Sequence, residues 1–170
     1  MTLAHFGLAI FMVGISLTDA TSTEKHLRMA PGDAFELAGY TFTFEEMRLV
    51  QGPNFVADEG AFTVTRDGQP VAELLPQKRR YLREGQVMTE AAIDPGLTRD
   101  IYVSLGEPLG DDGAWAVRLY HKPFVRWIWL GALFMTFGGF VAAGDKRYRA
   151  RRKGEVREPD VQAQAGTATA

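Results

Sequence analysis

The chain has 170 residues, which is enough for one ordinary domain together with membrane anchors. Its hydrophobic fraction of 46% and its formal net charge of -2 resemble those of a soluble protein, yet the apolar residues gather in two segments. There is no cysteine, which excludes disulfides, thiol redox chemistry and Cys-ligated zinc or iron–sulfur clusters formed by this chain.

The charges are sorted along the chain. Residues 19–121 hold 17 acidic and 10 basic side chains, whereas residues 144–170 hold 4 acidic and 7 basic ones. An asymmetry of this kind indicates that the two regions lie in different compartments. The acidic region has no basic stripe, which argues against a nucleic-acid partner.

The first apolar segment is Leu3–Leu17, which falls short of the roughly 20 residues that cross a membrane. One interpretation of the segment is the core of a signal peptide, but no Lys or Arg precedes it and no clear small-residue cleavage site follows it. As the second half of a transmembrane helix whose first half is missing, it accounts for the polar residue inside it. We assign residues 1–18 to such a helix, and the signal-peptide alternative stays open.

The polar residue is His5, and a histidine at membrane depth is costly unless something binds it. It is therefore a candidate ligand, and the alternative is a neutral histidine hydrogen-bonded to a neighbouring helix. On a helix His5, Leu8 and Met12 share one face. Gly7 and Gly14 lie about 200° around from His5. One face thus offers a ligand, and the other allows a second helix to approach closely.

Residues 19–122 are predicted to form an extracytoplasmic β-rich domain. Apolar residues alternate from Phe35 to Phe44, with a change of phase near Gly39 that is typical of a bulge. Arg66-Asp67-Gly68-Gln69 is typical of a hairpin turn. Six or seven short strands imply a small barrel or sandwich, and an OB-like barrel is one arrangement that fits.

Two further strands and one helix complete the expected elements of this domain. Ile101–Leu105 is β-branched and aromatic, and Ala114–Tyr120 alternates, with Trp115, Val117 and Leu119 on one side and Arg118 on the other. Glu45–Val50 is the one stretch with a helical pattern.

The domain shows no catalytic constellation. Glu90 and Asp94 are a conceivable carboxylate pair, but nothing in the sequence places them in a cleft. We expect His26 to be an exposed loop residue and His121 to lie at the membrane interface without binding anything. Lys78–Tyr81 is expected to be a solvated strand face, and the three histidines have no metal-ligand spacing.

The second apolar segment, Phe124–Ala143, has the length needed to span a membrane, and residues 123–144 are assigned to a transmembrane helix. Its one charge, Arg126, lies near its start, where a long side chain reaches the interface. A basic cluster at Lys146–Lys153 follows, which predicts that residues 145–170 are cytoplasmic and that their small-residue end is disordered. The start of this helix carries an aromatic belt formed by Tyr120, Phe124, Trp127 and Trp129.

Several stretches of this sequence match a known family in order and in spacing. They are Leu3-Ala4-His5-Phe6-Gly7, Gly52-Pro53-Asn54, MTEAAIDPGLTRDIYVSLGE at 88–107, GAWAVRLYHKPFVRWIWLG at 113–131 and Asp145-Lys146-Arg147-Tyr148-Arg149. Together they resemble the C-terminal part of the CcmF/NrfE family, the haem-ligation proteins of cytochrome c maturation. The resemblance covers nearly everything from Leu3 to Arg149.

The resemblance implies a polytopic bacterial inner-membrane protein whose β domain is periplasmic. Such a protein receives haem from a CcmE-type chaperone and helps to join it to an apocytochrome that a CcmH-type partner presents. A further haem, haem b, lies in the membrane between two histidines. His5 matches one of these axial ligands, in an Ala-His-x-Gly motif, and a neutral imidazole is a suitable donor to iron.

The departures from the family are as informative as the matches. The tryptophan-rich haem-handling segment is absent, as are the second ligand for His5 and most of the helices. We therefore expect a fragment or split subunit that supports haem b binding and periplasmic haem transfer but cannot complete ligation alone. One alternative is a non-enzymatic adaptor that docks the haem chaperone or the apocytochrome-delivery partner. Another is a single-pass envelope protein unrelated to haem.

Overall fold

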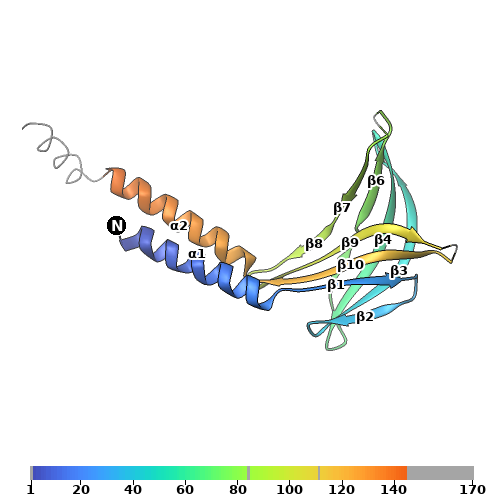
Figure 1. Ribbon diagram of the computed structural model, residues 1–170, viewed down its shortest axis with the longest axis horizontal. Coiled ribbons are helices and arrows are strands. Elements are labelled where there is room, and N and C mark those ends of the chain that lie inside the picture. Colours follow the sequence, from blue (N-terminus) through green and yellow to red (C-terminus); the bar gives the residue numbers. More distant parts are fainter. Residues whose placement is uncertain (1, 84, 111, 145–170) are drawn as a thin grey trace, which may run out of the picture.

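The computed structural model consists of a domain of strands with one helix before it and one after it in the chain, and the two helices lie side by side at one end of the domain (Figure 1). It describes residues 2–83, 85–110 and 112–144. The predicted basic cluster and disordered tail at 145–170 lie outside the described residues. The elements are α1 (Thr2–Thr21), β1 (Thr23–Met29), β2 (Ala34–Leu37), β3 (Tyr40–Gln51), β4 (Phe55–Arg66), β5 (Gln69–Leu74), β6 (Gln77–Tyr81), β7 (Val87–Glu90), β8 (Ala92–Pro95), β9 (Arg99–Leu109), β10 (Ala114–Pro123) and α2 (Val125–Gly144).

The strands form two antiparallel sheets. One has the order β1-β10-β9-β8, and the other has the order β2-β3-β4-β6-β7, with β5 paired to β4. Of the two predicted arrangements, barrel or sandwich, the chain therefore adopts the sandwich. The described residues contain ten strands rather than six or seven, because β1 is polar and exposed along most of its length and β7 and β8 have only four residues each.

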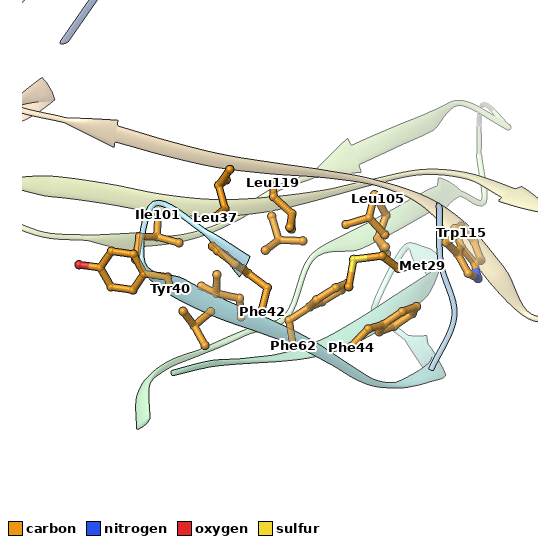
Figure 2. Packing of buried hydrophobic residues seen from close by; sticks show 14 residues of the cluster. Met29, Leu37, Tyr40, Phe42, Phe44, Phe62, Ile101, Leu105, Trp115 and Leu119 are labelled. Carbon is orange, nitrogen blue, oxygen red and sulfur yellow. The ribbon is translucent and has the colours of Figure 1, made fainter. Parts of the chain in front are cut away.

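The hydrophobic core lies between the two sheets (Figure 2). Phe44 and Phe62 stack face to face, with ring centroids 4.5 Å apart. Along β10 the predicted alternation is confirmed, since Val117 and Leu119 are buried while Arg118 is exposed. Each fully buried apolar side chain contributes about 1.5–3 kcal/mol. The largest of these side chains are Phe42, Phe44, Phe62, Ile101, Leu105 and Leu119.

Two local predictions are confirmed or corrected by the turns. Asp67 and Gly68 have φ values of 51° and 74°, so the predicted hairpin is a two-residue turn with both central residues left-handed. The change of phase near Gly39 is a hairpin turn rather than a bulge, because Ala38 and Gly39 have φ values of 52° and 77° and join β2 to β3. The helical interpretation of Glu45–Val50 is wrong, since these residues continue β3.

The reason for that error lies in the pairing of β3 with β4. The register shifts between Phe44 and Glu46, so a bulge interrupts the strict alternation of apolar and polar residues. Beyond the bulge, Leu49 is 74% exposed on a stretch of the hairpin that extends past the core. Without a buried face, this stretch does not show the period of two that identifies a strand.

The two helices pack against each other through glycines. Gly7, Gly14, Gly131 and Gly138 are the buried residues of α1 and α2. A Cβ atom at Gly7 would lie 2.6 Å from the backbone nitrogen of Met135, and one at Gly138 would lie 2.6 Å from the backbone nitrogen of Ala4. The helices are thus antiparallel and in backbone contact, as the positions of Gly7 and Gly14 predict (Figure 1).

The sandwich is joined to the helix pair at one end. β1 follows α1 and pairs with β10, which leads into α2, and Thr23 lies opposite His121. The Thr18 hydroxyl donates a hydrogen bond of 2.8 Å to the carbonyl oxygen of Pro123, which ties the end of α1 to the start of α2. Both apolar helices are long enough to cross a membrane, and they leave the sandwich from the same end (Figure 1).

We predict that Gly131→Leu separates the helices, because its Cβ alone would come 2.5 Å from the backbone nitrogen of Phe11. Overpacking costs about 1–3 kcal/mol, and backbone cannot rotate out of the way as a side chain does. The chain has no cysteine, so spin labels on Thr2→Cys and Ala143→Cys would report the separation of the helix ends.

Gly139→Leu is the matched control, since no heavy atom lies within 4 Å of a Cβ at Gly139. It should leave the distance between the labels unchanged. An unchanged distance in the Gly131→Leu chain would show that the helices do not depend on this contact.

Candidate functional site

The outer face of α1 carries the candidate ligand. His5 is exposed on this helix, together with Leu8 and Met12, which are 47% and 54% exposed. Gly7 and Gly14 are buried against α2 on the other side. The prediction that His5 and the two glycines lie on different faces of α1, with the glycines against a second helix, is therefore confirmed, while the role of His5 as a ligand stays a prediction.

This face combines an imidazole with apolar side chains further along the helix. An imidazole nitrogen is able to donate to a metal such as iron. The other two histidines, His26 and His121, belong to β1 and β10 of the sandwich, so they do not share the helix face with His5. In the part of the chain that the structure describes, no group of three or more His, Cys, Asp and Glu side chains is placed to hold a metal ion.

The conceivable carboxylate pair separates into two ion pairs. Glu90 in β7 lies 3.4 Å from Arg79, and Asp94 in β8 lies 2.5 Å from Arg99. These strands belong to different sheets. The two carboxylates therefore neutralise arginines and are not arranged for acid–base catalysis.

The stretch Lys78–Tyr81 is not the solvated face that was expected. Lys78, whose side chain is 11% exposed, donates a hydrogen bond of 2.9 Å to the carbonyl oxygen of Gly106 and thereby joins β6 to β9 of the other sheet. Tyr81 packs edge-on against Phe55, with ring centroids 5.9 Å apart. His26 is exposed as expected but lies in a strand rather than a loop, and its Nε2 is 2.6 Å from Glu24.

Sequence reasoning missed a cationic cluster at the end of the sandwich that adjoins the helices. Arg66 Nη1 and Arg99 Nε both donate to the Tyr40 hydroxyl oxygen, at 3.0 and 3.3 Å. The two guanidinium carbons lie 5.0 and 5.5 Å from the centroid of the Tyr40 ring. The His121 ring is 5.7 Å from the same ring. We call these four residues the Tyr40 cluster.

The Tyr40 cluster perturbs its own histidine. Burial lowers the pKa of His121, and the charges of Arg99 and Arg66 lower this pKa further. Its Nδ1 atom is buried and has no hydrogen-bond partner among the described residues. Partial burial lowers the pKa of the Arg99 guanidinium. Its hydrogen bonds to Asp94 and Tyr40 raise this pKa by more, so that it lies above its usual value.

An apolar and basic tip lies away from the helices. The β3–β4 turn and the β6–β7 hairpin meet there, and the Leu82 backbone nitrogen donates a hydrogen bond of 2.9 Å to the Asn54 carbonyl oxygen (Figure 1). Leu49, Leu82 and Val87 are 74%, 62% and 52% exposed. Arg80 and Arg83 are exposed as well. We call this surface the distal tip.

We predict that the chain loses stability as the pH falls below about 6.5, because the unfolded state then binds a proton that folded His121 resists. His121→Phe keeps a ring of similar size and does not titrate, so its stability should fall less over this range. Denaturant unfolding at a series of values from about pH 8 to about pH 5, the range in which an unfolded histidine titrates, would measure the free energy of unfolding of both chains. Equal slopes for both chains would contradict the assignment.

A family model described as the CcmF C-terminal beta-sandwich matches residues 20–123, which is the sandwich together with its junctions to the helices. The chain is 53% identical over 158 residues to the cytochrome c-type biogenesis protein CcmF of Pseudomonas fluorescens, covering 93% of this chain and 24% of that protein. It is 48% identical over 161 residues to the Escherichia coli K12 protein of the same name, and the match covers 95% of this chain and 25% of that protein.

A solved structure of the cytochrome c haem lyase CcmF has the same fold, with a TM-score of 0.67 at 18% identity, covering 80% of this chain and 23% of that chain. The chain thus spans about a quarter of the length of these relatives. The apolar helices and the family match together support an inner-membrane protein. The chain belongs to the CcmF family, of which it represents the C-terminal part.

Proposed function

We propose that this chain supplies one wall of a haem b site and the periplasmic domain of a cytochrome c haem lyase. The observation that carries the proposal is the position of His5, on the face of α1 that α2 leaves open. Family membership supports it, because the relatives are cytochrome c-type biogenesis proteins and the solved member is a haem lyase. The remaining portion of the lyase would supply the second axial ligand.

The residues of this face fit a haem. His5 offers an imidazole, and Leu8 and Met12 offer an apolar surface one and two turns further along the same face. Backbone contact between Gly7 and α2 prevents α1 from rotating, so the imidazole keeps its direction. Haem held in this way supplies one-electron chemistry, and His5 would bind and orient the iron.

The orientation in the membrane follows from the charges of the sequence. Six basic residues between Lys146 and Lys153 follow α2 directly, and such clusters lie on the cytoplasmic side. The proposed arrangement therefore has both helices spanning, the C-terminus in the cytoplasm and the sandwich, residues 19–122, in the periplasm. Proteolysis of sealed spheroplasts would cut within the sandwich if this orientation is right.

We predict that His5→Ala removes the low-spin b-type bands of the assembled lyase. The chain would be co-expressed with the N-terminal portion found in its longer relatives, and the reduced spectrum recorded in detergent. His5 would hold the iron, so in this variant the haem would lose one of its two protein ligands and with it the low-spin bands.

His26→Ala is the matched control, because it removes a histidine that is exposed on the sandwich. It should retain the full absorption. A His5→Ala complex with an unchanged b-type spectrum would discard the ligand assignment.

A second candidate function, a non-enzymatic adaptor, is favoured by the distal tip. Exposed leucine and valine side chains beside Arg80 and Arg83 suit a partner with an apolar surface and acidic residues. The partners considered are a CcmE-type haem chaperone and a CcmH-type apocytochrome-delivery protein. In this role the helices would serve as anchors.

We predict that Leu82→Asp weakens retention of one of these partners by the full chain in detergent, because it places a carboxylate in the apolar part of the tip. An interface hot spot costs about 2 kcal/mol or more, which is about 30-fold in affinity. Ile93→Asp is the control, since Ile93 is 55% exposed on β8, outside the tip. If neither partner is retained by the unmodified chain, the adaptor role fails.

A further inference from the structure

The Tyr40 cluster places two positive charges against one neutral oxygen. Arg66 and Arg99 approach the Tyr40 hydroxyl within hydrogen-bond distance, and both lie over its ring. The phenol orients the two guanidinium groups but carries no charge to balance them. Two like charges placed on one oxygen repel each other, and an anion beside them would offset this repulsion.

The carboxylates nearby balance only part of this charge. Asp94 lies 2.5 Å from Arg99 and occupies its Nη1. Arg66 Nε is 3.8 Å from Asp67, whose side chain is 92% exposed, so that water screens the pair. In the part of the chain that the structure describes, the guanidinium of Arg66 therefore has only an exposed, solvent-screened counter-ion.

Hydrogen-bonding capacity is left over at the same place. The Tyr40 hydroxyl accepts two bonds, and its own proton has no acceptor among the described residues. His121 Nδ1 is likewise buried without a partner in the described part of the chain. Figure 2 shows the Tyr40 hydroxyl at the end of the core, pointing away from Phe44 and Trp115. An anion with several acceptor oxygens would complete this arrangement.

The cluster lies level with the ends of the two helices. Arg99 is paired with Pro123, two residues before α2 begins at Val125. His121 is paired with Thr23, two residues after α1 ends at Thr21. If the helices span the bilayer as proposed, this level is the layer of lipid phosphates.

We propose that the Tyr40 cluster binds the phosphate of an anionic phospholipid through the guanidinium groups of Arg66 and Arg99. Planar guanidinium groups match phosphate oxygens in geometry and form charge-assisted hydrogen bonds to them. Binding would hold the end of the sandwich against the membrane surface. The proposal rests on the membrane orientation of the helices, but it does not depend on haem.

The test measures lipid binding by the full 170-residue chain in neutral detergent, with short-chain phosphatidylglycerol as the probe. Phosphatidylcholine and inorganic phosphate are compared in parallel. Arg66→Gln is the main variant, because its side chain is 56% exposed at a hairpin end and is not needed for the core. We expect it to weaken phosphatidylglycerol binding about tenfold, the loss of a hydrogen bond to a charged group.

Arg80→Gln is the matched control, with the same change of charge on an exposed position of β6 at the far end of the sandwich. It should bind phosphatidylglycerol as the unmodified chain does. Equal weakening by both variants, or none by Arg66→Gln, would overturn the site. Equal binding of phosphatidylglycerol and inorganic phosphate would overturn the assignment to a lipid. The haem spectrum of the Arg66→Gln lyase should be unchanged, which would show that this site is separate from the proposed haem site.

Discussion

The rest of the structure depends on the backbone contact between α1 and α2. Glycines at Gly7 and Gly131 leave no room for a side chain, so the two helices meet in one rotational setting. That setting turns His5 outward and brings the ends of α1 and α2 to the same place. The start of β1 and the end of β10 are therefore neighbours, and the two strands pair from Thr23 opposite His121 to Met29 opposite Trp115.

The two ends of the sandwich differ in chemistry because of this attachment. The end next to the helices gathers two arginines and a histidine around Tyr40. The distal tip carries exposed apolar side chains and arginines on two hairpins. If both proposals are right, one end would contact lipid phosphates and the other would contact a partner protein, so the sandwich would act as a spacer between the membrane surface and that partner.

The sequence predicted what depends on short-range periodicity. The two faces of α1, the turn at Asp67-Gly68 and the buried face of β10 all follow from the spacing of neighbouring residues. The Tyr40 cluster was not predictable in this way, because its members come from β3, β4, β9 and β10 of two different sheets. The helical interpretation of Glu45–Val50 failed where a bulge and a solvated hairpin removed the alternation. The location of His121 at the membrane interface stays a prediction, and the arginines beside it were not predicted.

His5 is proposed to bind the iron of haem b. Replacing its imidazole by another iron ligand tests this proposal more directly than removing the side chain does. Methionine in place of an axial histidine raises the reduction potential of haem iron. In the complex of His5→Met with the N-terminal portion of the lyase, redox titration of the b-type bands should therefore give a higher midpoint potential than in the unmodified complex. An identical potential and spectrum would show that the iron takes its ligands elsewhere.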